Sequence, residues 1–262
     1  MRKMLLVLLM ISHAALAEHV TIPLADGTSL QAELFRPDGP VVAPAIVALH
    51  GCGGPFASRD MQWRQALLAR GHIVLLPDSF GSRGLGSQCR NQQRTVTSFV
   101  VRRQDAITSA KYLTALPGTP PGGVALLGWS DGGSTVVAAG HTAPDLPEGL
   151  IRGSVAFYPG CYAGNSNAAW MPSGRMLMLM GEADDWTPIA PCRRLATRIG
   201  EPSLTLIGYP GAYHDFDAPG GVRVMRNVPS SQNADKTVHV GTDPAAQADA
   251  LARVPAFLEA LP

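Results

Sequence analysis

Residues 124–134 decide the fold and read Val124-Ala125-Leu126-Leu127-Gly128-Trp129-Ser130-Asp131-Gly132-Gly133-Ser134. An apolar run ends at Gly128, and a stretch typical of a helix begins at Ser134. A strand, then Gly-x-Ser-x-Gly, then a helix is the context of a nucleophile elbow, in which a serine sits on a strained turn with its Oγ exposed. Gly128 and Gly132 suit such a turn because neighbouring backbone can pass close to a residue without a Cβ. We therefore predict that Ser130 is a nucleophile.

Two further residue types are needed for this chemistry. A serine hydroxyl becomes an effective nucleophile when a base takes its proton and an acid orients that base. In folds with this elbow the chain order is serine, acid, histidine. After Ser130, the acids at a predicted strand end are Asp184 and Asp185, and His214 ends the next predicted strand. Open α/β sheets place their sites at such strand ends, so we predict that His214 is the base and one of these acids its partner.

Backbone N–H groups could stabilise the negatively charged oxygen of a tetrahedral intermediate. One candidate is the N–H of Asp131, directly after the predicted nucleophile. The other is expected in the loop 49–54, Leu-His-Gly-Cys-Gly-Gly, which follows an apolar strand. We predict Cys52 as this second donor, with Gly51 and Gly53 as alternatives.

Apolar runs alternate with helical patterns along most of the chain. A hairpin is predicted from residues 21–24 and 30–35. Continuous apolar runs are typical of strands buried on both faces of a parallel sheet; they occur at 45–49, 73–76, 124–127, 155–157, 176–180 and 204–207. Helices are expected at 60–70, 95–116, 134–139 and 244–261. This alternation predicts an α/β fold with a mostly parallel central sheet and helices on both faces.

The first seventeen residues are predicted to be a secretory signal peptide rather than part of the fold. Arg2 and Lys3 precede an apolar stretch at 4–11, and Ala15-Leu16-Ala17 supplies a small-x-small cleavage site. The apolar stretch is too short to span a bilayer, so we expect cleavage after Ala17 and no membrane anchor. Residues 18–262 are then expected to form one α/β domain of an exported, periplasmic or secreted protein.

The net charge and the cysteine spacing argue against several classes of protein. The net charge is +1 with no block of like charge, which gives no reason to expect nucleic acid as a partner. The four cysteines lack any C-x-x-C spacing, which argues against a zinc ribbon or a thioredoxin-like site. We predict two disulfides, Cys52–Cys89 and Cys161–Cys192, because each pair joins loops expected at the same end of the sheet. A free Cys52 that shapes the oxyanion loop is the alternative to the first pair.

Five ordered motifs together resemble the dienelactone hydrolase family of α/β-hydrolases. They are His50-Gly51-Cys52-Gly53-Gly54, residues 77–84 (Pro-Asp-Ser-Phe-Gly-Ser-Arg-Gly), residues 128–133, residues 181–188 (Gly-Glu-Ala-Asp-Asp-Trp-Thr-Pro) and residues 213–216 (Tyr-His-Asp-Phe). The resemblance implies hydrolysis of carboxylic esters or lactones without a metal or organic cofactor. It also implies that Asp184, three residues after Gly181, is the acid rather than Asp185, which would then cap the helix expected near Pro188. The name-giving enzymes carry cysteine where this chain has Ser130, which favours a general serine esterase.

The sequence leaves open the role of Arg83 and the exact class of function. Arg83 lies in the loop after the 73–76 strand, where its guanidinium could bind a substrate carboxylate or pair with Asp78 to brace the loop. A periplasmic peptidase of the same fold is one alternative function. A non-catalytic binding protein that kept the fold is another, although the set Ser130, Asp184 and His214 is complete. The small-molecule substrate and the oligomeric state are not predicted further.

Overall fold

A computed structural model describes residues 17–262, so residues 1–16 of the predicted signal peptide lie outside the described part. The main sheet has eight strands in the order β1-β2-β4-β3-β5-β6-β7-β8. Their bounds are β1 Glu18–Pro23, β2 Ser29–Phe35, β3 Ala45–Leu49, β4 Val74–Pro77, β5 Val124–Trp129, β6 Ile151–Phe157, β7 Arg175–Gly181 and β8 Leu204–Tyr209. The pairs β1–β2 and β2–β4 are antiparallel, and every pair from β4 to β8 is parallel. The predicted mostly parallel sheet is confirmed.

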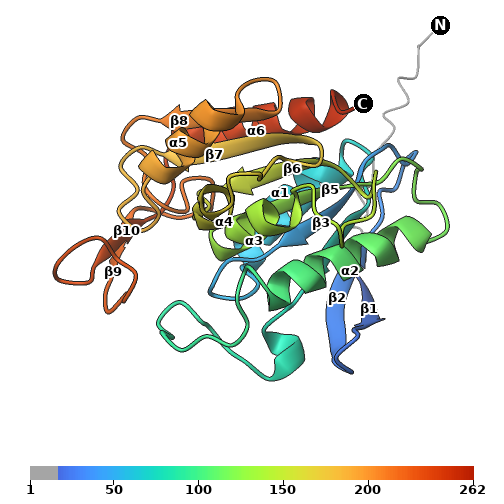
Figure 1. Cartoon of the computed structure of the whole chain (residues 1–262), viewed down its shortest axis with the longest axis horizontal. Coiled ribbons are helices and arrows are strands. Elements are labelled where there is room, and N and C mark those ends of the chain that lie inside the picture. Colours follow the sequence, from blue (N-terminus) through green and yellow to red (C-terminus); the bar gives the residue numbers. More distant parts are fainter. Residues whose placement is uncertain (1–16) are drawn as a thin grey trace, which may run out of the picture.

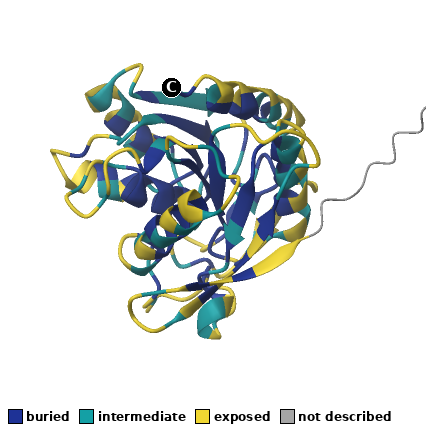
Figure 2. Ribbon diagram, turned by 90° about the vertical axis from the view of Figure 1, so that its right-hand side faces the viewer, coloured by how far each residue is buried: buried dark blue, intermediate teal, exposed yellow. Residues whose placement is uncertain are grey.

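Helices cover both faces of this sheet. Their bounds are α1 Ala57–Leu68, α2 Val101–Ala115, α3 Asp131–Ala139, α4 Tyr162–Ser166, α5 Ala190–Ile199 and α6 Pro244–Glu259, with one 3-10 turn at Gly81–Arg83. Helices α2 to α5 contact one another in succession, and α1 contacts α6; α2 and α3 lie in front of the sheet in Figure 1. Figure 2 shows the strands buried between helices whose outer faces are exposed. Burial on both faces explains the continuous apolar runs of β3, β5 and β7.

Helix α2 begins later than the sequence pattern predicts. The expected start was Thr95, whereas the first helical residue is Val101. The intervening residues contact the elbow helix instead: Ser98 Oγ donates to the Asp131 carboxylate at 2.7 Å. The N–H of Arg102 donates to the carbonyl of Thr97 at 3.0 Å. The Ser98–Asp131 contact joins segments that are far apart in the sequence, so local pattern does not reveal it.

A small two-stranded sheet lies outside the main one. Strand β9 (Arg223–Met225) pairs with β10 (Val238–Val240), and the segment projects from the body of the molecule at the left of Figure 1. We call residues 221–241 the cap segment. Its buried valines pack against Trp186 and the Cys52–Cys89 disulfide; they are Val228, Val238 and Val240. The sequence analysis missed both strands because each spans three residues.

Two disulfides join segments near the carboxyl ends of the strands, and Cys192 lies in the first turn of helix α5. Cys52 pairs with Cys89 at a Cα separation of 4.9 Å, and Cys161 pairs with Cys192 at 5.2 Å. This is the pairing that the sequence analysis predicts, so Cys52 is not free. Disulfides persist in oxidising compartments, so the pairs suggest an extracellular or periplasmic protein. None of the helices within residues 17–262 is long and apolar enough to cross a bilayer.

Candidate active site

Ser130 lies on a strained turn between β5 and α3. Its backbone has φ 56° and ψ −114°, a conformation that few non-glycine residues adopt. Neighbouring backbone passes so close that a Cβ on Gly128 would collide with the carbonyl oxygen of Gly132. A Cβ on Gly132 would collide in turn with the carbonyl oxygen of Leu49 on the adjacent strand. The glycines that identify the motif in sequence are therefore required by the close approach of three backbone segments.

The predicted nucleophile, base and acid meet at the carboxyl edge of the sheet. Ser130 Oγ lies 2.9 Å from His214 Nε2, and His214 Nδ1 lies 2.8 Å from Asp184 Oδ2. A carboxylate only accepts hydrogen bonds, so Nδ1 carries the proton and Nε2 accepts from the serine hydroxyl. His214 and Asp184 are 1% and 4% exposed, which protects this chain of hydrogen bonds from competing water. The arrangement has the geometry of a nucleophile with its base and orienting acid.

Asp184 is itself held by the turn that follows β7. Its Oδ1 accepts the backbone N–H groups of Trp186 and Thr187, each at 2.9 Å. The Thr187 hydroxyl lies 2.9 Å from Asp184 Oδ2 and 3.1 Å from His214 Nδ1. These contacts hold the carboxylate beside the imidazole. The sequence analysis missed Thr187, although a hydroxyl three residues after a predicted catalytic acid is the signal that could have found it.

Asp185 points to a different partner. Its carboxylate accepts the backbone N–H and the Nδ1–H of His239, at 2.9 and 2.8 Å, and the Asn233 amide at 2.8 Å. The expectation that Asp185 caps the following helix is therefore wrong, because both oxygens bind the cap segment instead. Helix α5 has no side-chain cap and begins with Pro191 in its first turn.

Aromatic rings enclose the imidazole of His214. The Tyr158 ring centroid lies 4.4 Å from that of His214, and the Trp186 centroid lies at 4.8 Å. Burial by these rings lowers the pKa of His214, but the nearby charge of Asp184 and its hydrogen bond outweigh burial. The net effect raises the pKa of His214 above 6.5. An imidazole with a raised pKa is a stronger proton acceptor.

Asp217 anchors the loop that carries His214. Its carboxylate is fully buried and accepts from Trp63 Nε1 at 2.6 Å, Trp129 Nε1 at 2.9 Å and the Tyr158 hydroxyl at 2.7 Å. Trp129 directly precedes Ser130, and the Tyr158 ring packs at a tilt against the imidazole of His214. Burial raises the pKa of the Asp217 carboxyl. One buried side chain thus connects the loop that carries His214 to helix α1, strand β5 and the end of strand β6, a role that the sequence analysis did not find.

The loop 51–54 lies directly beside the elbow, as predicted. A Cβ on Gly51 would be 3.6 Å from Ser130 Cβ. Within the described residues, the N–H groups of Cys52 and Asp131 donate to no backbone carbonyl, whereas the N–H of Gly54 donates to Gly51 at 3.2 Å. The two predicted oxyanion donors therefore remain candidates with unengaged N–H groups next to the serine.

Arg102 joins the predicted oxyanion loop, residues 49–54, to helix α3, the elbow helix. Its side chain is fully buried, and its guanidinium donates to the His50 carbonyl at 2.6 Å and to the Asp131 carboxylate. Arg94 adds a second contact to Asp131 at 3.1 Å. Burial raises the pKa of the Asp131 carboxyl, but the charges of Arg102 and Arg94 and the hydrogen bonds from Ser98 and Arg102 together outweigh burial, so the pKa is lowered overall. The Asp131 carboxylate is thus charged and accepts hydrogen bonds from Arg94, Ser98 and Arg102. Its side chain ties the start of helix α3 to the segment 94–102.

Arg83 does not have the partner that was expected. Its guanidinium makes a two-pronged ion pair with Asp105 on α2, at 2.8 and 2.9 Å, and donates to the Ser79 carbonyl at 2.8 Å. Asp78 instead accepts the N–H groups of its own loop, from Phe80 and Gly81. Arg83 braces the loop through Asp105, and we no longer expect a substrate contact from it.

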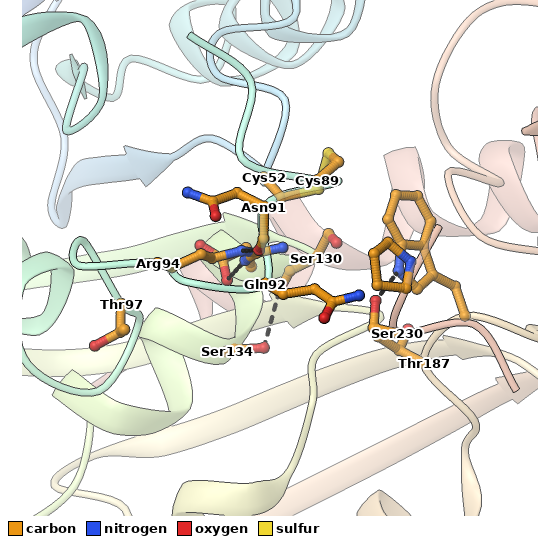
Figure 3. A pocket seen from close by; sticks show the side chains of 13 residues that line it. Cys52, Cys89, Asn91, Gln92, Arg94, Thr97, Ser130, Ser134, Thr187 and Ser230 are labelled. Carbon is orange, nitrogen blue, oxygen red and sulfur yellow. Dashed lines mark hydrogen bonds and ion pairs between the residues drawn. A yellow bond between two sulfur atoms is a disulfide. The ribbon is translucent and has the colours of Figure 1, made fainter. Parts of the chain in front are cut away.

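Two cavities open at Ser130. The larger, of about 590 Å³, is shown in Figure 3, and the smaller has about 260 Å³. Cys52, Cys89, Ser130 and Trp186 line both cavities. Within residues 17–262, no group of three or more His, Cys, Asp or Glu side chains is arranged to hold a metal ion. Ser130 is therefore reached from two sides, past the Cys52–Cys89 disulfide and the indole of Trp186.

A protein-family model described as the dienelactone hydrolase family matches residues 30–261. The match covers almost the whole described chain. The chain belongs to the dienelactone hydrolase family. This family membership makes the protein a carboxylic ester hydrolase.

Solved structures share the fold of this dienelactone hydrolase family member. A putative dienelactone hydrolase from Klebsiella pneumoniae is 16% identical with a TM-score of 0.70, covering 95% of this chain and 100% of that one. A dienelactone hydrolase from Anabaena variabilis is 17% identical with a TM-score of 0.66, covering 95% and 100%. Esterase 2 from Thermogutta terrifontis, phosphoramylated by tabun, is 17% identical with a TM-score of 0.66, covering 93% and 94%. No curated protein matches the sequence.

Proposed function

We propose that this dienelactone hydrolase family member is a serine hydrolase that cleaves carboxylic esters or lactones through an acyl-enzyme. The observation that carries the proposal is the hydrogen-bonded chain from Ser130 Oγ through His214 to Asp184, at 2.9 and 2.8 Å. A serine so paired can attack a carbonyl carbon, because the imidazole accepts its proton as the bond forms.

The proposed reaction has two halves. In the first, Ser130 Oγ bonds to the carbonyl carbon while His214 Nε2 takes the hydroxyl proton. The N–H groups of Cys52 and Asp131 stabilise the resulting oxyanion. The carbon–oxygen bond to the alcohol then breaks, and His214 returns its proton to the departing oxygen. In the second half, water repeats these steps on the acyl-enzyme and releases the acid.

Asp184 acts in this scheme through the imidazole. It holds His214 in the tautomer with the proton on Nδ1 and stabilises the imidazolium that forms in both halves. Its own bonds to the N–H groups of Trp186 and Thr187 hold it in place. The serine nucleophile, in place of the cysteine of the name-giving enzymes, supports general esters and lactones rather than dienelactone as substrates.

The proposed setting is outside the cytoplasm. Two disulfides support an oxidising compartment. Export through a signal peptide cleaved after Ala17 remains a prediction, as does a single domain over residues 18–262.

Hydrolysis of p-nitrophenyl acetate by the purified mature protein tests the proposed function. We expect a burst of p-nitrophenol equal to the enzyme concentration if deacylation is the slower half. Ser130→Ala should lower turnover by about 10⁴- to 10⁶-fold while the protein stays folded. Turnover of p-nitroanilide peptides in preference to esters would favour a peptidase. A folded protein without turnover of either would favour a binding protein.

A further inference from the structure

The two cavities at Ser130 differ in which catalytic side chain they expose. His214 lines the smaller cavity and is not among the residues that line the larger one. The smaller cavity also receives the oxyanion loop from Gly51 to Gly54. The larger cavity instead extends along the elbow helix, past Asp131 and Ser134.

The chemistry of ester cleavage indicates which cavity receives the alcohol part of the substrate and which receives the acyl part. When the carbon–oxygen bond breaks, the departing alcohol oxygen must accept the proton held on His214 Nε2. The alcohol part of the ester therefore has to lie on the side where His214 is exposed. The acyl part remains bonded to Ser130 and extends in the other direction. The smaller cavity thus receives the alcohol and the larger cavity receives the acyl group.

The larger cavity offers unused hydrogen-bonding groups. Gln92 and Thr97 line it, and within the described residues neither side chain makes a hydrogen bond. Figure 3 shows Gln92 extending from its loop toward the side of the cavity where Ser230 lies. Arg94 uses its Nε and one Nη on Asn91 and Asp131, at 3.2 and 3.1 Å. These groups would hydrogen-bond a hydroxylated or amide-bearing acyl group.

The smaller cavity has a different lining. Pro55 and Phe56 bound it beside the oxyanion loop, and Met225 of the cap segment bounds it as well, together with the exposed Arg223. Its charged pair, Arg59 and Asp215, lies 3.9 Å apart. A cavity of about 260 Å³ with these apolar walls suits a small, weakly polar alcohol.

We propose that the enzyme selects esters of a polar, hydrogen-bonding acid with a small alcohol, with the acyl group beside Gln92 and Thr97 and the alcohol beside Phe56 and Met225. The inference rests on the proposed function, because it takes Ser130 as the nucleophile and His214 as the acid that protonates the alcohol. Gln92 and Met225 then determine specificity on opposite sides of the same ester bond.

Two isomeric esters test this assignment. Methyl 3,5-dihydroxyphenylacetate places the polar ring in the acyl group, whereas 3,5-dihydroxybenzyl acetate places the same ring in the alcohol. Both leaving groups are alkyl alcohols. We expect kcat/KM to favour the methyl ester by about tenfold or more, because in the other isomer the hydroxyls would lose water against Phe56 and Met225. Equal values, or a preference for the benzyl acetate, would overturn the assignment.

Matched variants locate each half of the substrate. Gln92→Trp narrows the larger cavity, and Met225→Trp narrows the smaller one. The acyl-enzyme retains only the acyl group, so the deacylation rate of the 3,5-dihydroxyphenylacetyl enzyme should fall about tenfold in Gln92→Trp. In Met225→Trp the loss should appear instead as a reduced acylation rate that grows with the size of the alcohol, from methyl to butyl esters. The reverse pattern would place the acyl group in the smaller cavity.

Failure of the assignment is distinguishable from failure of the proposed function. If the hydrolysis of both isomers is lost in Ser130→Ala but the preference between them is reversed, the function stands and the assignment of cavities is wrong. If Ser130→Ala leaves the hydrolysis of both esters intact, the proposed function itself is wrong. Thermal unfolding of both tryptophan variants shows whether either change has disturbed the fold.

Discussion

Asp184 and Asp185 are neighbours in the chain, yet their carboxylates bind different histidines. Asp184 lies 2.8 Å from His214 Nδ1, and Asp185 lies 2.8 Å from His239 Nδ1. The first contact is fully buried beside Ser130, whereas His239 is 38% exposed on the cap segment. One turn therefore holds both the predicted base and the segment that bounds the smaller cavity.

Because Asp184 and Asp185 bind different histidines, we expect different effects from the matched substitutions Asp184→Asn and Asp185→Asn. Asp184→Asn should lower kcat by about 10³- to 10⁴-fold, because the amide no longer enforces the Nδ1–H tautomer of His214. Asp185→Asn should lower kcat by about tenfold or less, because it weakens only the anchoring of the cap segment. Steady-state kinetics on one ester compares them directly. A larger loss in Asp185→Asn would mean that the acid has been assigned one residue too early.

The raised pKa of His214 predicts how activity depends on pH. The imidazole must be neutral to accept the serine proton, so kcat/KM should fall as pH falls through the His214 pKa, at a value above 6.5. In Asp184→Asn the charge that raises this pKa is gone while burial remains. The residual activity of that variant should therefore persist to lower pH. An inflection that stays in place would show that another group controls the profile.

The two disulfides should contribute similarly to stability but differently to catalysis. They close segments of 37 and 31 residues, so removal of either should lower the free energy of unfolding by a similar amount, about 4 kcal/mol on the chain-entropy account. Only Cys52–Cys89 lines the cavities at Ser130. We expect the double variant Cys52→Ala, Cys89→Ala to lose about 10- to 100-fold in kcat, through displacement of the oxyanion loop.

The matched control is the double variant Cys161→Ala, Cys192→Ala. It should lose comparable stability in urea unfolding while kcat at a temperature well below its midpoint falls far less. Equal losses of kcat in the two double variants would show that the first disulfide acts on stability alone.

We expect Arg83 to contribute to stability and not to substrate binding. Its ion pair with Asp105 is largely buried, with side-chain exposures of 14% and 1%. Removing the guanidinium leaves Asp105 buried without its partner, so Arg83→Ala should lower the free energy of unfolding by about 3 kcal/mol. KM should change equally for acidic and neutral esters. A selective increase for acidic esters would restore the substrate contact that the structure argues against.

Much of this architecture could be predicted from local patterns. The elbow, the order of the candidate residues and the parallel strands all have short sequence signatures with a direct physical cause. Gly128 and Gly132, for example, are fixed by close backbone approach within one turn. Both disulfides could be predicted because the cysteines of each pair follow predicted strands that end at the same edge of the sheet.

The features that were missed depend on contacts between distant segments. Ser98 bonds Asp131 thirty-three residues away, which delays the start of α2. Asp217 accepts from Trp63, 154 residues earlier in the chain, and Arg83 finds Asp105 rather than the nearer Asp78. A single sequence shows that such polar groups need partners, but not which partners the fold brings to them.

The central claim is that Ser130 is the nucleophile activated by His214. The most direct measurement is reaction of the mature protein with a fluorophosphonate, followed by mass spectrometry of its peptides. We predict one phosphonyl group per chain, located on Ser130, and its loss in both Ser130→Ala and His214→Gln. A label on any other serine, or an unchanged label in Ser130→Ala, would contradict the account.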